Sequence, residues 1–259
     1  MEQSAWKAGN RMRIEYCGLC DKGLNRVMNQ DAVFMGAKQD KAVFAVADGM
    51  GGHRHGEAAS GTIIAEIREW WERQLTAGDN DCFGEMACSL QRQIEGANRI
   101  IYEYYNHAGV CGSTIVVLMI YKQEYCILSS GDSRIYYLNG RDWRQLTEDD
   151  VWENLPEVKS GYSPVQQREH ANYGRLTQAI GIAKDTAIKG RMGILKQGDR
   201  FLLCSDGLYK MCGESAVKRL LQKYKGRRNG DRLLGQMLEE IYENGAKDNI
   251  AAVLVRWRT

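Results

Sequence analysis

The chain has 259 residues, of which 44% are hydrophobic and 26% are charged, as in an ordinary globular protein. Its 35 basic and 33 acidic residues leave a formal net charge of only +2, which argues against a nucleic-acid binder that relies on phosphate neutralisation. Residues 1–16 lack the apolar core of a signal peptide, and the longest apolar run, Ile115–Tyr121, is too short to cross a bilayer, so we expect a cytoplasmic monomer without nucleic-acid or membrane partners.

The first third of the chain predicts strands followed by helices. Short apolar or alternating runs bounded by Gly, Asp and Lys predict strands at residues 12–19, 32–36 and 42–47. The period then changes, and apolar side chains recur every three or four residues over 59–75 and again over 85–106. These two segments are predicted to be long amphipathic helices, each able to cover one face of a sheet.

Strands return in the middle of the chain, and a second helix pair follows. Segments rich in Ile, Val and Tyr predict strands at 112–121, 125–130 and 134–138, and further strands at 201–204 and 250–255. Helices are predicted at 214–224 and 231–242. Residues 148–175 are polar and contain both prolines, so we expect a surface flap there. The pattern predicts one α+β domain over residues 1–259, with two packed sheets between outer helix pairs.

Five aspartates stand at the edges of strongly apolar strands: Asp31, Asp48, Asp132, Asp206 and Asp248. A half-buried carboxylate is costly unless its charge is compensated, and a pair of divalent cations would compensate several carboxylates at once. Hard cations such as Mg²⁺ or Mn²⁺ prefer such oxygen ligands. Each element alone has a simpler interpretation, because Asp-Gly after a strand is usually a turn. The joint pattern favours a metal centre over separate turns.

The eight cysteines suggest no second centre. Without a secretion signal we expect free thiols, several of them acting as small hydrophobes inside strands. Cys17 and Cys20 form a C-x-x-C, which fits a zinc half-site or a redox pair, but two ordinary strand cysteines are the preferred interpretation. The four histidines are scattered rather than clustered at ligand spacing, which argues against a zinc hydrolase.

A series of motifs in this order resembles the metal-dependent Ser/Thr protein phosphatases, the PPM or type 2C family, in the form of its bacterial branch. The motifs are RVMNQD (26–31), DGMGGH (48–53), GEAAS (56–60), GST (112–114), GDSR (131–134), LTQAIG (176–181), SDGL (205–208) and DNI (248–250). Together they extend over nearly the whole chain. The resemblance implies a central antiparallel β-sandwich flanked by α-helix pairs, in four αββα layers.

The resemblance also implies roles for individual residues. Asp48 should bridge two Mn²⁺ or Mg²⁺ ions, with the Gly49 carbonyl, Asp206 and Asp248 completing one site and Asp31 at the other. Asp132, together with Asp206, resembles the ligands of a third, weaker ion. Arg26 matches the arginine that binds the substrate phosphate, where a guanidinium fork suits phosphate geometry. The implied reaction is hydrolysis of phospho-Ser or phospho-Thr by a metal-activated water.

The sequence departs from the family pattern at two places. Met50 follows the Asp-Gly, as in bacterial relatives, where eukaryotic ones have a histidine, so His53 is the nearby candidate for the general acid. Alternatively, His53 only orients a water or caps the next helix. In the flap, Asp150 stands where a histidine is expected, and His170 is followed by Ala171 rather than proline.

Three functions remain to be separated. The leading one is a phosphoprotein phosphatase that opposes a bacterial Ser/Thr kinase. A second keeps the fold and the chemistry but acts on one dedicated regulatory partner, such as a phosphorylated anti-sigma-type protein. A third is a binding module with an inactive site, which is disfavoured because none of the core aspartates is missing.

Overall fold

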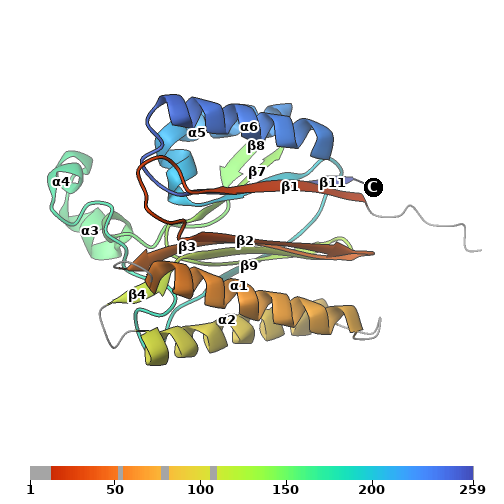
Figure 1. The fold of residues 1–259 in the computed structure, drawn as a ribbon, viewed down its shortest axis with the longest axis horizontal. Coiled ribbons are helices and arrows are strands. Elements are labelled where there is room, and N and C mark those ends of the chain that lie inside the picture. Colours follow the sequence, from red (N-terminus) through yellow and green to blue (C-terminus); the bar gives the residue numbers. More distant parts are fainter. Residues whose placement is uncertain (1–12, 52–54, 77–81, 106–109, 259) are drawn as a thin grey trace, which may run out of the picture.

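The computed structural model describes residues 13–51, 55–76, 82–105 and 110–258. Two antiparallel sheets lie face to face, and a pair of helices covers the outer face of each, which confirms the predicted α+β sandwich (Figure 1). The pairs are α1 (His55–Thr76) with α2 (Phe83–Tyr105), and α5 (Asp206–Lys223) with α6 (Arg227–Glu243). In the described part of the chain, no helix is apolar over a length that would span a bilayer.

The two sheets are built from strands that are distant in sequence. The first has the order β1 (Arg13–Asp21), β11 (Ile250–Arg258), β10 (Arg200–Cys204), β7 (Arg134–Asn139) and β8 (Asp142–Gln145). The second has the order β2 (Asp31–Lys38), β3 (Lys41–Gly51), β5 (Ile115–Tyr121), β6 (Glu124–Ser130) and β9 (Lys189–Ile194), and β4 (Cys111–Ser113) pairs with β3. Central strands such as β5 are buried on both faces, which explains their continuous apolar sequence.

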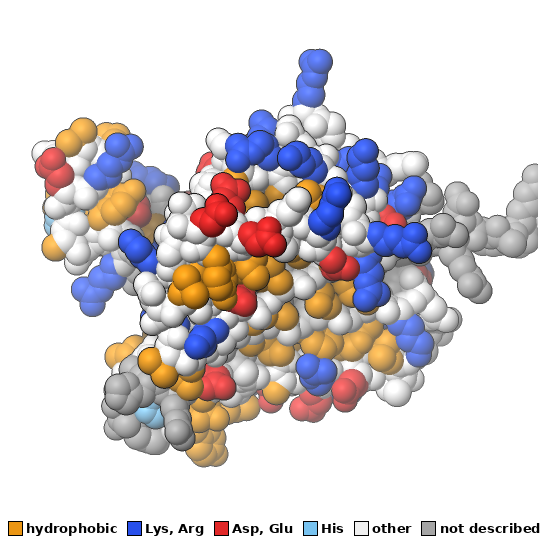
Figure 2. Space-filling view, turned by 45° about the horizontal axis from the view of Figure 1, so that its top comes forward, with side chains coloured by type: hydrophobic (Ala, Val, Ile, Leu, Met, Phe, Trp, Pro, Cys, Tyr) orange, Lys and Arg blue, Asp and Glu red, His pale blue; other side chains and the backbone are white. Residues whose placement is uncertain are grey.

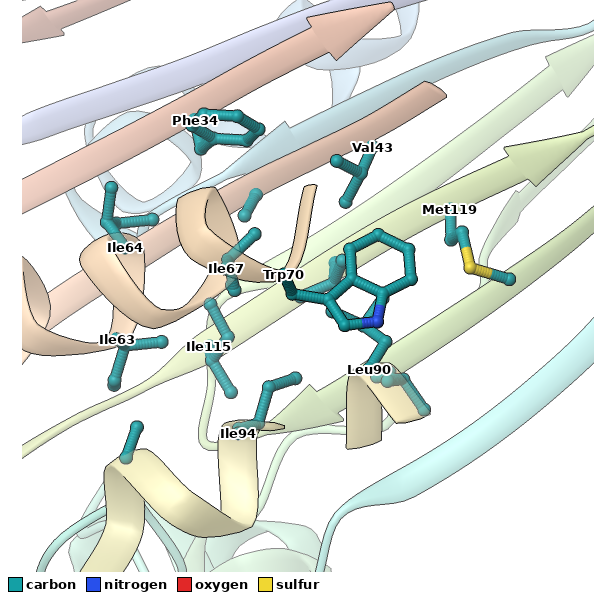
Figure 3. Packing of buried hydrophobic residues seen from close by; sticks show 14 of the residues in the cluster. Phe34, Val43, Ile63, Ile64, Ile67, Trp70, Leu90, Ile94, Ile115 and Met119 are labelled. Atoms are coloured by element: carbon teal, nitrogen blue, oxygen red, sulfur yellow. The ribbon is translucent and has the colours of Figure 1, made fainter. Parts of the chain in front are cut away.

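Three apolar layers hold the sandwich together. One lies between the two sheets and includes Phe44 and Phe201. The other two join each sheet to its helix pair. Trp70 lies at the centre of the layer under α1, packed near Ile67 and Leu90 (Figure 3). Its indole Nε1 donates to Ser89 Oγ of α2 at 2.8 Å, so one buried side chain fixes both helices to the sheet.

Some elements differ from the sequence prediction. Helix α5 begins at Asp206, not at residue 214, and contains Gly213 with φ +75°, which interrupts the helical pattern. The predicted strand at 112–121 is divided into β4 and β5. Strand β9 was not predicted, because nearly all of its residues are exposed and no apolar alternation marks it. Its pairing with β6 depends on backbone hydrogen bonds, which residue type does not reveal.

The segment expected to be a flap stands out from the sandwich at one end (Figures 1 and 2). It contains η2 (Trp152–Asn154), α3 (Pro156–Gly161) and α4 (Pro164–Glu169), and each proline lies in the first helical turn, where its missing N–H costs nothing. Trp152 stacks on His170 with ring centroids 4.1 Å apart. The flap therefore has a small aromatic core of its own.

The cysteines form no disulfide. All eight are free thiols. Cys17 is buried and Cys20 exposed, as expected for residues three apart on a strand, whose side chains point to opposite faces. Burial raises the pKa of the Cys17 thiol to about 12, so this thiol is a poor nucleophile at neutral pH. The C-x-x-C consists of two unconnected strand cysteines.

Candidate metal centre

The β2–β3 hairpin places two acids side by side. Asp31 and Asp48 are direct partners in the register of these strands, and Asp31 is only 7% exposed. After burial itself, Asp31 and Asp206 are the neighbours with the largest electrostatic effect on the Asp48 carboxyl. Burial, reinforced by the neighbouring aspartates, raises the pKa of Asp31 to about 7 and that of Asp48 well above its usual value. Raised pKa values of this kind indicate that the ionised carboxylates lack enough compensating positive charge.

Two further acids come from the other sheet. Asp206 follows β10 and Asp248 precedes β11, and these antiparallel neighbours bring the two residues to the same sheet edge. Asp48, Asp132, Asp206 and Asp248 line one pocket of about 270 Å³ at the flap end of the sandwich. Asp31 lies behind it, against Asp48. The fold thus gathers the five aspartates that the sequence singled out.

Ser205 connects Asp31 to the opposite sheet. Its buried Oγ donates to Asp31 Oδ2 at 2.7 Å and accepts from the Ala251 N–H at 2.9 Å. Asp31 Oδ1 is also buried but has no hydrogen-bond partner. A buried carboxylate oxygen without a partner is costly, so this atom is suited to a ligand that brings positive charge.

Gly49 is required by a close approach of backbones. A Cβ at this position would lie 2.1 Å from the Gly56 carbonyl oxygen and 2.7 Å from that of Gln30. The Gly49 N–H donates to the Gln30 carbonyl at 3.0 Å. Any side chain here would push β3 away from the start of α1, so glycine fixes the backbone beside Asp48.

Residues quoted only as parts of motifs support the acids. Asp48 is clamped through its backbone, because its carbonyl accepts from Thr114 N–H at 2.9 Å and from Ser113 Oγ at 3.0 Å. Asn249 Oδ1 accepts from Gln30 N–H at 2.9 Å, and Asn249 Nδ2 donates to the Met28 carbonyl at 3.1 Å. The loop that carries Arg26 is thereby attached to the start of β11.

Two basic side chains form ion pairs with the acids of the site. Arg26 Nη2 lies 2.7 Å from Asp248 Oδ1, and about half of its side chain is exposed. Lys210 Nζ lies 2.7 Å from Asp206 Oδ2 and 3.2 Å from Asp132 Oδ2. Burial alone would lower the pKa of Lys210, but Asp206 and Asp132 outweigh it and raise the pKa above its usual value. The sequence analysis missed Lys210, although its spacing of four from Asp206 would have indicated it once α5 was known to begin at Asp206.

The residues fit a pair of hard divalent cations. In the described ranges, no group of three or more acidic, histidine or cysteine side chains is arranged as a cage that could hold a metal ion. Mg²⁺ and Mn²⁺ need no such cage, because they keep several waters and accept backbone carbonyls. The donors here are oxygens, the Asp31 and Asp48 carboxyls have raised pKa values, and Asp31 Oδ1 lacks a hydrogen-bond partner. Each of these features favours divalent cations with oxygen ligands.

The sequence model for the family described as Protein phosphatase 2C matches residues 25–255. The chain belongs to this family. This family agrees with the resemblance drawn from the motifs. The match covers the flap, every aspartate of the site, and all strands except β1 and the last residues of β11.

Curated relatives and solved structures agree with this family. The chain is 29% identical to the serine/threonine phosphatase stp of Listeria welshimeri over 91% of its length and 92% of that protein. It is 27% identical to PstP of Mycobacterium tuberculosis, but spans only 44% of that protein's length. The Streptococcus agalactiae serine/threonine phosphatase structure aligns with a TM-score of 0.80 at 28% identity, covering 94% of this chain and 98% of that one. The structure of a PstP catalytic domain in complex with two manganese ions aligns with a TM-score of 0.78 at 25% identity, covering 96% of this chain and all of that one.

Asp150 and His170, the flap residues that depart from the phosphatase 2C motif pattern, make contacts of their own. Asp150 accepts from the Gly131 N–H at 2.9 Å and pairs with Lys189 at 2.6 Å, so it ties the flap to the loop before Asp132. His170 stacks in the flap and does not line the pocket, whereas Gly174 and Leu176 do. His53 lies outside the described residues, so its role as general acid stays a prediction.

Proposed function

We propose that this protein hydrolyses phosphoserine and phosphothreonine in proteins, using two Mn²⁺ or Mg²⁺ ions held by Asp31, Asp48, Asp206, Asp248 and the Gly49 carbonyl. The observation that carries the proposal is the convergence of Asp48, Asp206 and Asp248 on one polar pocket, with Asp48 paired to Asp31 across the β2–β3 hairpin and coupled electrostatically to Asp206. A carboxylate in that central position is suited to bridge two ions.

Each residue of the pocket then has a definite task. Divalent ions supply Lewis acidity, which lowers the pKa of water and offsets phosphate charge. Ser205 orients Asp31, and the clamp from Ser113 and Thr114 fixes Asp48. The exposed guanidinium of Arg26 can exchange Asp248 for the phosphate oxygens, because its fork of donors suits both groups.

The pocket also limits the substrate. About 270 Å³ of mostly polar space suits a phosphoryl group and its waters, so the protein part of the substrate must lie outside it. Gly174 and Leu176 bring the end of the flap to the rim, where they would contact the chain that carries the phosphate. His53 is proposed as the proton donor to the leaving oxygen.

The biological setting is part of the proposal. We propose one catalytic domain over residues 1–259, acting as a cytoplasmic monomer on phosphoproteins, among them a bacterial Ser/Thr kinase. The relatives named serine/threonine phosphatase support the phosphoprotein substrate class. A panel of phosphoproteins separates this broad role from the narrow one, since activity on a single partner would favour a dedicated regulatory phosphatase.

The catalytic claim is tested with p-nitrophenyl phosphate and a phosphothreonine peptide in the presence of Mn²⁺. Asp206→Ala should lower kcat/KM on the order of a thousandfold, the scale expected when a principal electrostatic group is lost. Asp185→Ala, at an exposed aspartate away from the pocket, is the matched control and should retain full activity. Equal rates for the two variants would exclude metal catalysis at this site, and an inactive wild type would favour a binding module.

A further inference from the structure

Lys210 lies where the family resemblance implies a third ion. That resemblance assigns Asp132 and Asp206 to a third, weaker metal, yet here both carboxylates are bonded to one ammonium group, at 3.2 and 2.7 Å. We propose that Lys210 permanently replaces the third ion, so that this phosphatase binds two divalent ions and carries the third positive charge on its own chain. The inference rests on the proposed function, since it concerns the same site.

The fold holds Lys210 in this position. Asp206 and Lys210 are four residues apart on the first turns of α5, where side chains at this spacing face the same way. The neighbouring Tyr209 hydroxyl donates to the Asp132 carbonyl at 3.0 Å. Helix α5 therefore contacts Asp132 twice. Tyr209 binds the backbone carbonyl of Asp132, and Lys210 binds its side-chain carboxylate. The ammonium meets Asp132 because of this docking and not by chance rotation.

Burial distinguishes this contact from an ordinary surface ion pair. An exposed ion pair at helical spacing contributes little to stability, because water screens it. The side chain of Asp132 is only 6% exposed, although that of Lys210 remains half exposed. In the described residues, Lys210 is the cation that forms an ion pair with Asp132. A buried carboxylate requires a partner, and the lysine provides it.

The ammonium and a divalent ion exclude each other from this position. Lysine is a compact point charge with three donors, so it satisfies one oxygen from each carboxylate and neutralises one negative charge. An ion between Asp132 and Asp206 would have to displace Nζ and would be repelled by it at close range. Among the described residues, Lys210 forms its ion pairs with Asp132 and Asp206, so the Asp31, Asp48 and Asp248 carboxylates stay available for the two ions of the proposed centre.

The test counts Mn²⁺ ions bound per chain by equilibrium dialysis and elemental analysis, with free Mn²⁺ checked by electron paramagnetic resonance. Wild type should bind about two ions, and Asp132→Asn should still bind about two. Lys210→Ala should bind about three ions per chain. The double variant Asp132→Asn/Lys210→Ala should again bind about two. Lys210→Arg, which keeps the charge, should resemble wild type. Lys223→Ala, at an exposed lysine in the last turn of α5, is the matched control.

The outcomes distinguish a failure of the lysine proposal from a failure of the proposed metal centre. A wild type that binds three ions, one of which is lost in Asp132→Asn, would overturn the lysine proposal and leave the metal centre intact. Failure of Lys210→Ala to gain an ion, with circular dichroism showing a folded variant, would overturn it as well. A wild type that binds no Mn²⁺ would remove both the lysine proposal and the proposed function.

Discussion

Replacing Ser205 with alanine removes one hydroxyl from the most enclosed part of the centre. This hydroxyl donates to Asp31 Oδ2 at 2.7 Å and accepts from the Ala251 amide at 2.9 Å. The other oxygen of Asp31 already has no partner. After the substitution, therefore, the Asp31 carboxyl loses the donor that orients it, and one buried amide loses its acceptor.

Two magnitudes follow from these two bonds. Loss of a hydrogen bond that orients a metal ligand typically costs about 10–100-fold in metal affinity, or roughly 1.4–2.7 kcal/mol. A buried amide without an acceptor costs about 1–3 kcal/mol of folding free energy. We expect Ser205→Ala to weaken Mn²⁺ binding by about one to two orders of magnitude and to lower the free energy of unfolding of the metal-free protein by about 1–3 kcal/mol.

Titration calorimetry with Mn²⁺ measures the first effect, and urea unfolding in EDTA measures the second. Ser130→Ala is the matched control, because Ser130 is equally buried at the end of β6 and its Oγ has no hydrogen-bond partner. Removing an unpaired hydroxyl should change neither quantity. The reasoning would be refuted if Ser205→Ala bound Mn²⁺ as tightly as Ser130→Ala.

Three other predictions concern the phosphate, the pH and the core. Arg26→Ala should lower kcat/KM on a phosphopeptide at saturating Mn²⁺ by about 10–100-fold, and Arg26→Lys should recover only part of it, because an ammonium lacks the bidentate fork. Burial raises the pKa of Asp31 from 3.8 to about 7, so without metal the folded state retains a proton that the unfolded chain releases. This stabilisation is complete below the unfolded pKa and is lost as the pH rises through about 7. The melting temperature in EDTA should therefore fall between about pH 4 and 7, and excess Mn²⁺ should remove the fall. Trp70→Ala should cost about 3–5 kcal/mol in urea unfolding, against little change for the exposed Tyr104→Ala.

Each of these has an outcome that would contradict it. Unchanged kcat/KM in Arg26→Ala would remove the arginine from phosphate binding. A melting temperature in EDTA that rises over the same pH range would mean that the carboxyl cluster is ionised without metal. A Trp70→Ala loss below about 1 kcal/mol would mean that the layer under α1 collapses around the gap.

The core of the fold was predictable because its strands are apolar on both faces. Residues 42–47, 201–204 and 250–255 are buried almost without exception, and such runs can only lie inside a covered sheet. The aspartates at the ends of these strands were predictable for a related reason, since strands that share a sheet bring their ends to common edges. The apolar runs thus predicted the core strands, and the places of the aspartates at the ends of these runs predicted that the acids lie close together.

The parts that escaped prediction depend on contacts between distant segments. Strand β9 pairs with β6 through its backbone, and Met192 and Ile194 on it are more than half exposed. Helix α5 contains Gly213, whose positive φ breaks the apolar period and hid the first turns of the helix. Lys210 lies on those hidden turns, 78 residues from Asp132. A pattern among neighbouring residues cannot indicate a contact between residues so far apart in the sequence.

The central claim is tested most directly by diffraction from crystals soaked in Mn²⁺, with data collected at the manganese absorption edge. The account predicts two anomalous peaks that share Asp48, one also touching Asp206, Asp248 and the Gly49 carbonyl and the other near Asp31. It predicts no peak between Asp132 and Asp206, where Lys210 lies. An absence of peaks at Asp48, or manganese bound by other residues instead, would contradict the account.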